Sequence, residues 1–209
     1  MVDRVITNNI VEITGKAVSE YTFSHQIYGE SFYSLGIEVT RLSNSVDVIP
    51  IIISERLVDI KENILGKYVI IKGQFRSYNK HENNKSRLIL SVFTREIEFL
   101  DENINKNPNT IFIDGYICKP PVYRTTPFGR EITDLLIAVN RPYNKSDYIP
   151  AIAWGRNAKY AEKFNVGERM KVWGRIQSRN YQKKQVDGTA LNKVAYEVSV
   201  SKLEEVEEE

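Results

Sequence analysis

The chain is 209 residues long, and its 29 Lys and Arg residues nearly balance 27 Asp and Glu residues. This length allows one or two domains, and the longest apolar run, residues 48–53, is far shorter than the roughly 20 residues of a membrane-spanning helix. The single cysteine cannot form an intramolecular disulfide, which is typical of a reducing cytoplasm, and two histidines far apart in the sequence do not indicate a metal site.

Charge is distributed unevenly along the chain. Residues 1–105 carry 12 basic and 14 acidic side chains, whereas residues 106–203 carry 17 basic and 8 acidic ones. The last six residues contain five glutamates. A basic second half favours contact with a polyanion, and the alternative is an ordinary solvated basic face.

Alternating apolar residues predict a series of strands in the first half. The expected strands cover residues 10–15, 35–41, 48–54, 68–77 and 87–93, and the last of them extends toward residue 99. Leu57, Ile60 and Ile64 follow one another at helical spacing, which predicts a short helix after the third strand.

The second half repeats this order. Its expected strands cover residues 110–115, 135–141, 148–154, 170–178 and 193–201, with a short helix near residues 158–164. Asp147-Tyr-Ile-Pro150 repeats Asp47-Val-Ile-Pro50 after 100 residues. The polar, Asn-rich segment 101–109 reads as a linker. We therefore expect two domains, residues 1–103 and residues 104–209, the second with a short acidic tail.

Three strands, a short helix and two more strands in each half indicate the fold class. They predict an all-β protein with short helices, built as two tandem OB-folds, each a five-stranded Greek-key barrel. Gly73 and Gly174 occupy matching places within the fourth strands and suit the sharp bends of such barrels. A single ten-stranded sandwich matches the strand number but not the repeated helix.

No set of residues with catalytic spacing stands out. The sequence has no paired carboxylates in a recognisable motif, no GxxxxGK[ST] loop and no Cys–His pair in a suitable context. We expect no enzymatic activity, no cofactor and no metal ion.

The third strand of the second half favours nucleic-acid binding. Period-two alternation places Tyr148, Pro150, Ile152 and Trp154 on one face, and Ile149, Ala151 and Ala153 on the other, which looks like core. Exposed aromatic rings stack on unpaired bases with little regard to sequence. The alternative is that Tyr148 and Trp154 cap the barrel core.

Basic residues surround this strand and continue into the last hairpin, residues 178–189, where Tyr181 lies among cations. Such cations neutralise phosphates. The candidates are Arg124, Arg130, Arg141, Lys145, Arg156, Arg179, Lys183 and Lys184. The first half has Val48 and Ser54 in place of the two strand aromatics, although its last hairpin retains Arg76, Tyr78 and Lys80. We expect the first half to bind nucleic acid weakly or to bind protein instead.

From residue 109 to residue 206 the chain resembles the bacterial single-stranded DNA-binding protein family. The resemblance is carried, in order, by Arg124-Thr-Thr-Pro-Phe-Gly129, Leu136-Ile-Ala-Val-Asn-Arg141, Asp147-Tyr-Ile-Pro150, Trp154-Gly155, Gly167 and Gly174-Arg-Ile-Gln-Ser-Arg179. The first half resembles the same family more faintly, through residues 35–41, Asp47–Pro50 and Gly73.

The resemblance implies several roles. The aromatics that match Tyr148, Trp154 and Tyr181 stack on bases, and Tyr143 lies near a further aromatic position of the family. The family works as four OB-folds, so a chain with two implies a homodimer, and the face that carries Lys171, Trp173 and Arg175 matches a subunit contact. The family's acidic tail has a hydrophobic tip that recruits replication and repair proteins. Here the acidity remains but no aromatic tip does, which puts that recruitment in doubt.

These observations favour a non-enzymatic, cytoplasmic protein that binds single-stranded DNA and protects it in replication, recombination or repair. A second hypothesis is an adaptor whose OB-folds make protein–protein contacts in a replication or primosome assembly. RNA binding is a third option, because stacking alone does not distinguish ribose from deoxyribose.

Overall fold

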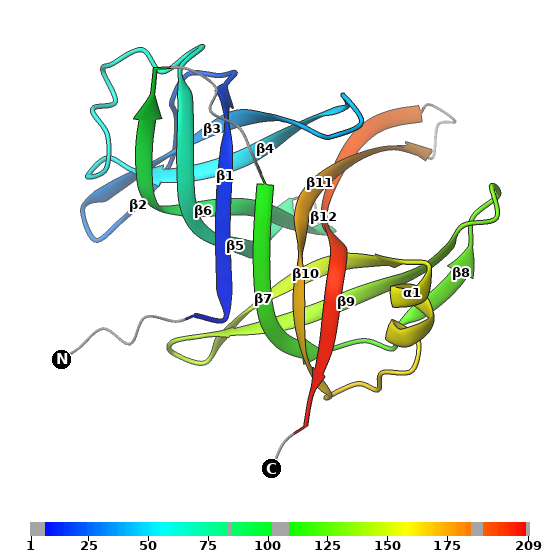
Figure 1. The fold of residues 1–209 in the computed structure, drawn as a ribbon. Coiled ribbons are helices and arrows are strands. Elements are labelled where there is room, and N and C mark those ends of the chain that lie inside the picture. The colour runs from blue at the N-terminus through cyan, green and yellow to red at the C-terminus, as the bar shows by residue number, and fades with distance from the viewer. Residues whose placement is uncertain (1–6, 83–84, 102–108, 185–189, 208–209) are drawn as a thin grey trace.

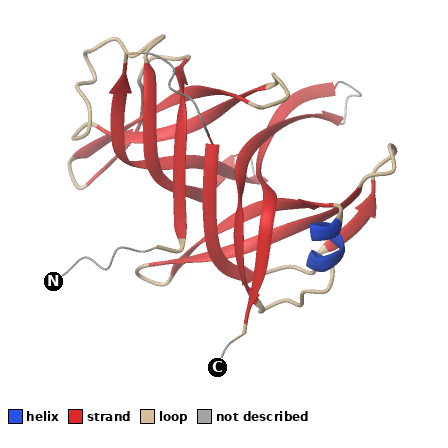
Figure 2. Ribbon diagram, viewed as in Figure 1, coloured by secondary structure: helices blue, strands red, loops and turns tan. Residues whose placement is uncertain are grey.

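The structure is a computed structural model that describes residues 7–82, 85–101, 109–184 and 190–207 (Figures 1 and 2). Within these residues the chain forms twelve strands and one helix. In the first half they are β1 (Asn9–Ala17), β2 (Thr22–Ile27), β3 (Glu30–Thr40), β4 (Val46–Ser54), β5 (Tyr68–Glu82) and β6 (Lys85–Leu100). In the second half they are β7 (Asn109–Ile117), β8 (Val122–Thr125), β9 (Glu131–Arg141), β10 (Lys145–Trp154), α1 (Arg156–Ala161), β11 (Arg169–Lys184) and β12 (Ala190–Val206).

Five strands of the first half form a closed ring. Strand β1 pairs with β3 and with β5, β3 pairs with β4, β5 pairs with β6, and β4 and β6 close the ring in parallel at Ile51 and Val92. The interior contains fully buried apolar side chains, among them Ile13, Ile37 and Phe75. Alternation along the strands therefore builds one barrel core, as the sequence predicts.

The second half closes in the same way. Strand β7 pairs with β9 and β11, β9 with β10, β11 with β12, and β10 pairs in parallel with β12. The expected pair of five-stranded OB-fold barrels is thus confirmed. Each barrel also carries a short outer strand, β2 or β8, which the sequence analysis did not predict because these strands are mostly exposed and lack an apolar alternation.

The predicted helix of the first half is wrong, whereas that of the second half forms as α1. Residues 55–67 adopt turns in place of a helix. The side chains of Asp59 and Asn63 accept hydrogen bonds from the backbone N–H groups of Lys61 and Leu65, two residues further on. Such local bonds offer the backbone an alternative to helical pairing. Only Ile64 of the three spaced apolar residues is fully buried.

Gly73 and Gly174 mark the expected bends. The pairing of β5 with β6 shifts register at Gly73, and that of β11 with β12 shifts at Gly174. A Cβ atom on Gly174 would overlap the carbonyl oxygen of Ser199, and one on Gly73 would overlap that of Phe93. At both places the opposite strand approaches too closely for any side chain.

The two barrels join through their first strands, where β1 pairs antiparallel with β7 and places Ile10 opposite Phe112. The β5–β6 and β11–β12 hairpins continue beyond their own barrels as two arms. Each arm contacts the other barrel: β5 packs against β10, and β11 packs against β4. Figure 1 shows the β11–β12 arm rising beside the β3–β4 turn of the first barrel. The halves therefore exchange arms in a reciprocal manner.

The repeated aspartates hold these arms. The backbone N–H of Ser178, on the β11 arm, donates to Asp47 Oδ1 at 2.6 Å, and the Ser178 hydroxyl donates to the same oxygen at 2.8 Å. In the other junction the N–H of Ser77 donates to Asp147 Oδ1 at 2.7 Å, and the N–H of Tyr148 donates to Ser77 Oγ at 2.7 Å. Both aspartates are fully buried. The sequence repeat thus marks the contact between the halves.

Candidate nucleic-acid interface

Strand β10 presents two aromatic side chains at the surface of the second barrel. Tyr148 is 42% exposed and Trp154 is 36% exposed, whereas Ile149, Ala151 and Ala153 lie in the core. Two rings on one strand, six residues apart, lie roughly 20 Å from each other. Their partial exposure leaves ring surface accessible for stacking. Ile152, expected on the same face, is buried where β10 pairs with β12.

Tyr143 extends this surface at the β9–β10 turn. Its side chain is fully exposed, and its backbone has a φ of 63°, in the left-handed region that non-glycine residues rarely adopt. The neighbouring Asn144 has a φ of 53°. The tight turn therefore places the aromatic ring of Tyr143 outside the barrel.

Three of the predicted cations lie around the aromatic strand. Arg124 on β8 pairs with Asp134 on the neighbouring strand, with 2.8 Å between Nε and Oδ2, and its side chain is half exposed. Arg130 is exposed in the β8–β9 turn, and Arg156 is exposed at the first residue of α1, two residues after Trp154. Among the described residues, neither Arg130 nor Arg156 forms an ion pair with a carboxylate.

The structure separates Tyr181 and Arg179 from this group. Both lie on the β11–β12 arm, which contacts β4 of the first barrel. Tyr181 is 37% exposed, and Arg179 lies 3.7 Å from Glu197. The side chains of Lys183 and Lys184 lie outside the described residues.

The other arm brings residues of the first half to the second barrel. Tyr78 is 54% exposed and follows Ser77, which is bonded to Tyr148. Arg76 precedes Ser77, and its guanidinium lies 4.0 Å from the centre of the Phe93 ring. Aromatic and basic residues from both halves thus lie around Tyr148, an arrangement that the order of residues in the sequence does not show.

A basic pocket of about 270 Å³ lies at this junction. Its lining includes four cationic side chains and Tyr143, and none of the residues that line it is acidic: Gln74, Arg76, Arg95, Arg141, Pro142, Tyr143 and Lys145. Burial, together with the positive charges of Arg95 and Arg141, lowers the pKa of Arg76 to about 10. Arg95 could not be predicted from the sequence, because pairing between β5 and β6 brings it to this pocket and no motif marks it.

Arg141 is only partly neutralised. Its Nε atom lies 3.3 Å from Asp147 Oδ2, yet neither atom makes a hydrogen bond of acceptable geometry. The equivalent Arg41 makes two aligned hydrogen bonds to Asp47, at 2.6 and 2.5 Å. The two junctions therefore share their residues but differ in the strength of the ion pair.

The face of the first barrel that corresponds to the aromatic strand differs. Val48 and Ser54 replace Tyr148 and Trp154, and the Ser54 hydroxyl bonds to the carboxylate of Glu30 at 2.5 Å. Tyr196 of the second half donates its hydroxyl to the Val48 carbonyl at 3.0 Å. This face lacks the two aromatic rings and is partly covered by Tyr196 of the other half, and its Glu30 carboxylate is paired with Arg56 at 3.2 Å.

A second surface carries the residues expected at a subunit contact. Trp173 packs against Phe112 with 5.1 Å between ring centres, and Lys202 Nζ lies 4.6 Å above the Trp173 ring. Ile10, opposite Phe112 on β1, is 49% exposed. Lys171 and Arg175 flank Trp173 and are half-buried, and Arg175 Nε is buried without a hydrogen-bond partner. The row Ile10–Phe112–Trp173 is an apolar strip on the outside of the joined sheet.

No group of His, Cys, Asp or Glu side chains within the described ranges has the arrangement of a metal site. In the same part of the chain, no helix is long and apolar enough to span a membrane.

Comparison with known proteins identifies what the second barrel resembles. Residues 108–206 match the model of the Single-strand binding protein family. Single-stranded DNA-binding protein 3 of Clostridium acetobutylicum is 34% identical over 88 residues, which cover 39% of this chain and 60% of that protein. Single-stranded DNA-binding protein A of Bacillus subtilis is 32% identical over 103 residues, or 46% of this chain and 59% of that protein. The chain thus spans about 60% of the length of these relatives.

The fold has a close counterpart among solved structures. The wild-type single-stranded DNA-binding protein from Thermus aquaticus superposes with a TM-score of 0.73 at 18% identity, over 96% of this chain and 94% of that one. At this identity the match supports the fold, and it extends over both barrels.

Proposed function

Because residues 108–206 match the model of the Single-strand binding protein family, we propose that this chain binds single-stranded DNA with little sequence preference. It would hold the strand by aromatic stacking and phosphate neutralisation, and protect it during replication, recombination or repair. We assign residues 1–103 to a first OB-fold domain and residues 104–209 to a second, which carries most of the binding surface.

The observation that carries this proposal is the exposed pair Tyr148 and Trp154 on β10. Stacking of one base on an aromatic side chain contributes about 1–3 kcal/mol, whatever the base. Arg156 lies two residues after Trp154, and Tyr143 continues the row beyond Tyr148. A strand laid along β10 would therefore meet alternating rings and cations, with no pattern of donors and acceptors that selects a sequence.

The first half supports this surface in a different way. Its own β4 face carries Val48 and is partly covered by Tyr196. Its β5–β6 arm, however, brings Tyr78 and Arg76 next to Tyr148. We assign the DNA contacts of the first half to this arm, and those of Tyr181, Arg179, Lys183 and Lys184 to the reciprocal arm of the second half.

For the assembly, we assign the contact between two chains to the strip Ile10–Phe112–Trp173. An apolar strip on the outside of a sheet favours a partner surface, and Lys171 and Arg175 at its side provide polar contacts. Two chains would unite four OB-folds in a cytoplasmic homodimer that has no enzymatic activity and needs no cofactor.

Tryptophan fluorescence tests the function, because the two tryptophans lie on different surfaces. The variant Trp173→Phe leaves Trp154 as the reporter, and Trp154→Phe leaves Trp173. On titration with oligo-dT we expect strong quenching of Trp154, weak change of Trp173, and a logarithm of the affinity that falls linearly with the logarithm of the salt concentration. Absence of both quenching and salt dependence would rule out the proposed binding.

A pull-down from nuclease-treated lysate separates the function from that of a protein adaptor. Partners that bridge through DNA are lost after nuclease treatment. Partners that remain bound to a chain with no affinity for oligo-dT would favour the adaptor.

A further inference from the structure

The basic pocket at the arm junction has the composition of an anion site. Arg76 and Arg95 come from the first half, and Arg141 and Lys145 come from the second. Among the described residues, neither Arg95 nor Lys145 takes part in an ion pair. Four cations that converge without an equal number of carboxylates repel one another, and an anion placed between them relieves this repulsion.

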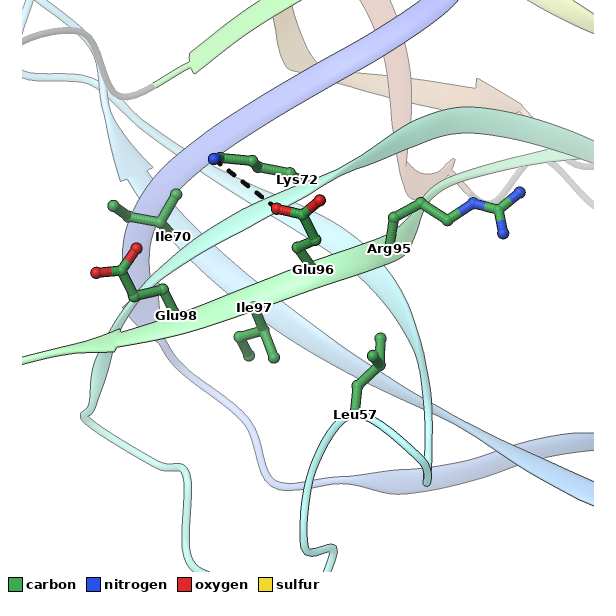
Figure 3. A pocket seen from close by; sticks show the side chains of 7 residues that line it. All are labelled: Leu57, Ile70, Lys72, Arg95, Glu96, Ile97 and Glu98. Atoms are coloured by element: carbon green, nitrogen blue, oxygen red, sulfur yellow. Dashed lines mark ion pairs between the residues drawn. The ribbon is translucent and has the colours of Figure 1, made fainter. Parts of the chain in front are cut away.

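Arg95 is oriented away from the nearest carboxylates. It also lines a neighbouring pocket of about 400 Å³ that contains Glu96 and Glu98. Figure 3 shows its guanidinium pointing away from both glutamates, whereas Lys72 points to Glu96 and pairs with it at 3.9 Å. The charge of Arg95 therefore remains available on the side of the basic pocket.

The equivalent junction in the other half has no such excess of positive charge. From the strand registers, Gln177 takes the place of Arg76, and Ser201 takes the place of Arg95. Glu197 adds a carboxylate there, bonded to Gln177 at 2.9 Å. Arg41 is consequently surrounded by Asp47 and Glu197. The two junctions are related by the repeat, but only one has become cationic.

The loose bond of Arg141 fits the same interpretation. Arg41 directs two aligned hydrogen bonds to its aspartate, while Arg141 makes none to Asp147 despite a separation of 3.3 Å. Arg141 also lines the pocket. The positive charge of Arg141 is therefore less fully neutralised than that of Arg41, and it contributes to the attraction of the pocket for an anion.

We propose that this pocket binds a backbone phosphate of single-stranded DNA, so that the strand crosses from the aromatic surface of the second barrel to the arm of the first. The inference rests on the proposed function and adds a specific site to it. Tyr143 at the rim and Tyr148 beside the arm place the pocket at the end of the aromatic row. The diverged first half then contributes to binding through Arg76 and Arg95 rather than through its own β4 face.

The test uses exposed residues, so that the fold is preserved. In the full chain, Arg95→Gln and Lys145→Gln should each weaken oligo-dT binding several-fold at low salt and reduce the slope of log affinity against log salt by about 0.7, the value for one phosphate contact of a single strand. Arg95→Lys should retain most of the slope. Lys61→Gln removes the same charge from an exposed turn outside the pocket and is the matched control.

The possible outcomes distinguish failure of the pocket assignment from failure of the proposed DNA-binding function. If wild type binds oligo-dT and Arg95→Gln and Lys145→Gln behave like Lys61→Gln, the pocket assignment is wrong while the function stands. If wild type does not bind oligo-dT at all, the function itself fails and the pocket assignment fails with it. A lower slope in both pocket variants, with an unchanged slope in the control, supports the site.

Discussion

Asp47 and Asp147 occupy equivalent positions, and both are fully buried, but their carboxylates are stabilised to different degrees. Burial alone would raise the pKa of Asp47, yet hydrogen bonds from Arg41 and Ser178 together outweigh it and lower the pKa below its usual value. Burial raises the pKa of Asp147, and the bond from Ser77 and the charge of Arg141 offset only part of this. The ionised carboxylate of Asp47 therefore stabilises the folded state, whereas the ionised carboxylate of Asp147 destabilises it.

This difference predicts unequal effects of removing the charge. Asp47→Asn should lower the free energy of unfolding at pH 7 by about 2 kcal/mol or more, because hydrogen bonds to a charged group are lost. Asp147→Asn should cost less, because an amide oxygen can still accept the bond from Ser77 without the penalty of a buried charge. Urea denaturation of both variants measures the difference. Equal losses would contradict the account.

The sign of the pH dependence follows from the same shifts. The folded-state pKa of Asp47 is lowered, so its contribution is complete above the unfolded pKa of about 3.9 and is lost as pH falls through the folded pKa. The folded-state pKa of Asp147 is raised, so its penalty is present at neutral pH and is relieved in acid. We expect the stability difference between the two Asn variants to shrink in denaturation curves recorded at progressively lower pH.

At the same scale, the aromatic residues of β10 should dominate DNA affinity. Tyr148→Ala and Trp154→Ala should each weaken oligo-dT binding by about 1–3 kcal/mol, roughly 5- to 150-fold, through loss of one stacked base. Tyr160→Ala removes a comparably exposed tyrosine on α1 and serves as the control. Fluorescence anisotropy with labelled oligo-dT measures all three. If the control weakens binding as much as the β10 variants do, stacking on β10 is not the source of affinity.

Among the elements, the two bulged strands set the geometry of the arms. Each arm begins beyond the register shift at Gly73 or Gly174, where the opposite carbonyl leaves no room for a Cβ atom. The bend sends the hairpin across to the other barrel, where Ser77 and Ser178 bond to the buried aspartates. The position of Tyr78 and Tyr181 therefore depends on a glycine several residues earlier.

Gly174→Ala should consequently destabilise the protein, although Ala is normally the more favourable residue within a strand, because the backbone of Ser199 must move. We expect a fall of several degrees in the melting temperature, measured by circular dichroism. Asn180→Ala, an exposed position on the same strand, should have little effect. An unchanged melting temperature for Gly174→Ala would show that the close approach is not required.

Element by element, alternation and repeats in the sequence predicted ten of the strands and both barrels, since a core built by period-two burial is local information. The outer strands β2 and β8 were missed because exposed strands have no such signal. The helix after β4 was predicted wrongly. The spacing of Leu57, Ile60 and Ile64 is helical, but it carries no information on the side-chain hydrogen bonds of Asp59 and Asn63, which form turns instead of a helix.

The site was predictable in part. Burial alternation indicated that Tyr148 and Trp154 could be exposed, and both are. The arm exchange was not predictable, because contacts between residues about 70 to 130 positions apart, such as Ser77 with Asp147 and Ser178 with Asp47, leave no local pattern. For the same reason the sequence grouped Tyr181 with Trp154, and left Arg95 unnoticed.

On the scale of the whole molecule, the duplication makes one chain resemble a pair of subunits. Strands β1 and β7 join the barrels into a continuous sheet, and the arms reinforce the junction from both sides. The repeat has then diverged: one barrel retains the aromatic strand, and the other supplies an arm and two arginines to the basic pocket. We therefore expect the two joined barrels to bind DNA together, with each barrel contributing part of the binding surface.

The assembly prediction also belongs to this scale. Trp173→Glu places a charge on the apolar strip and should convert a dimer to a monomer in light scattering after size-exclusion chromatography, because an unpaired charge is costly to bury. Lys163→Glu, exposed after α1, changes charge outside the strip and is the control. A wild-type chain that is monomeric at micromolar concentration would contradict the assigned contact.

The central claim is that two joined barrels hold an unpaired strand through exposed rings and backbone phosphates. Affinity for single-stranded against double-stranded DNA of the same length, at one salt concentration, tests it most directly, because paired bases are not available for stacking. The account predicts binding to the single strand at least about tenfold tighter, a difference of roughly 1.4 kcal/mol that one stacked base can supply. Equal affinity for both forms would reduce the interaction to phosphate contact alone and contradict the claim.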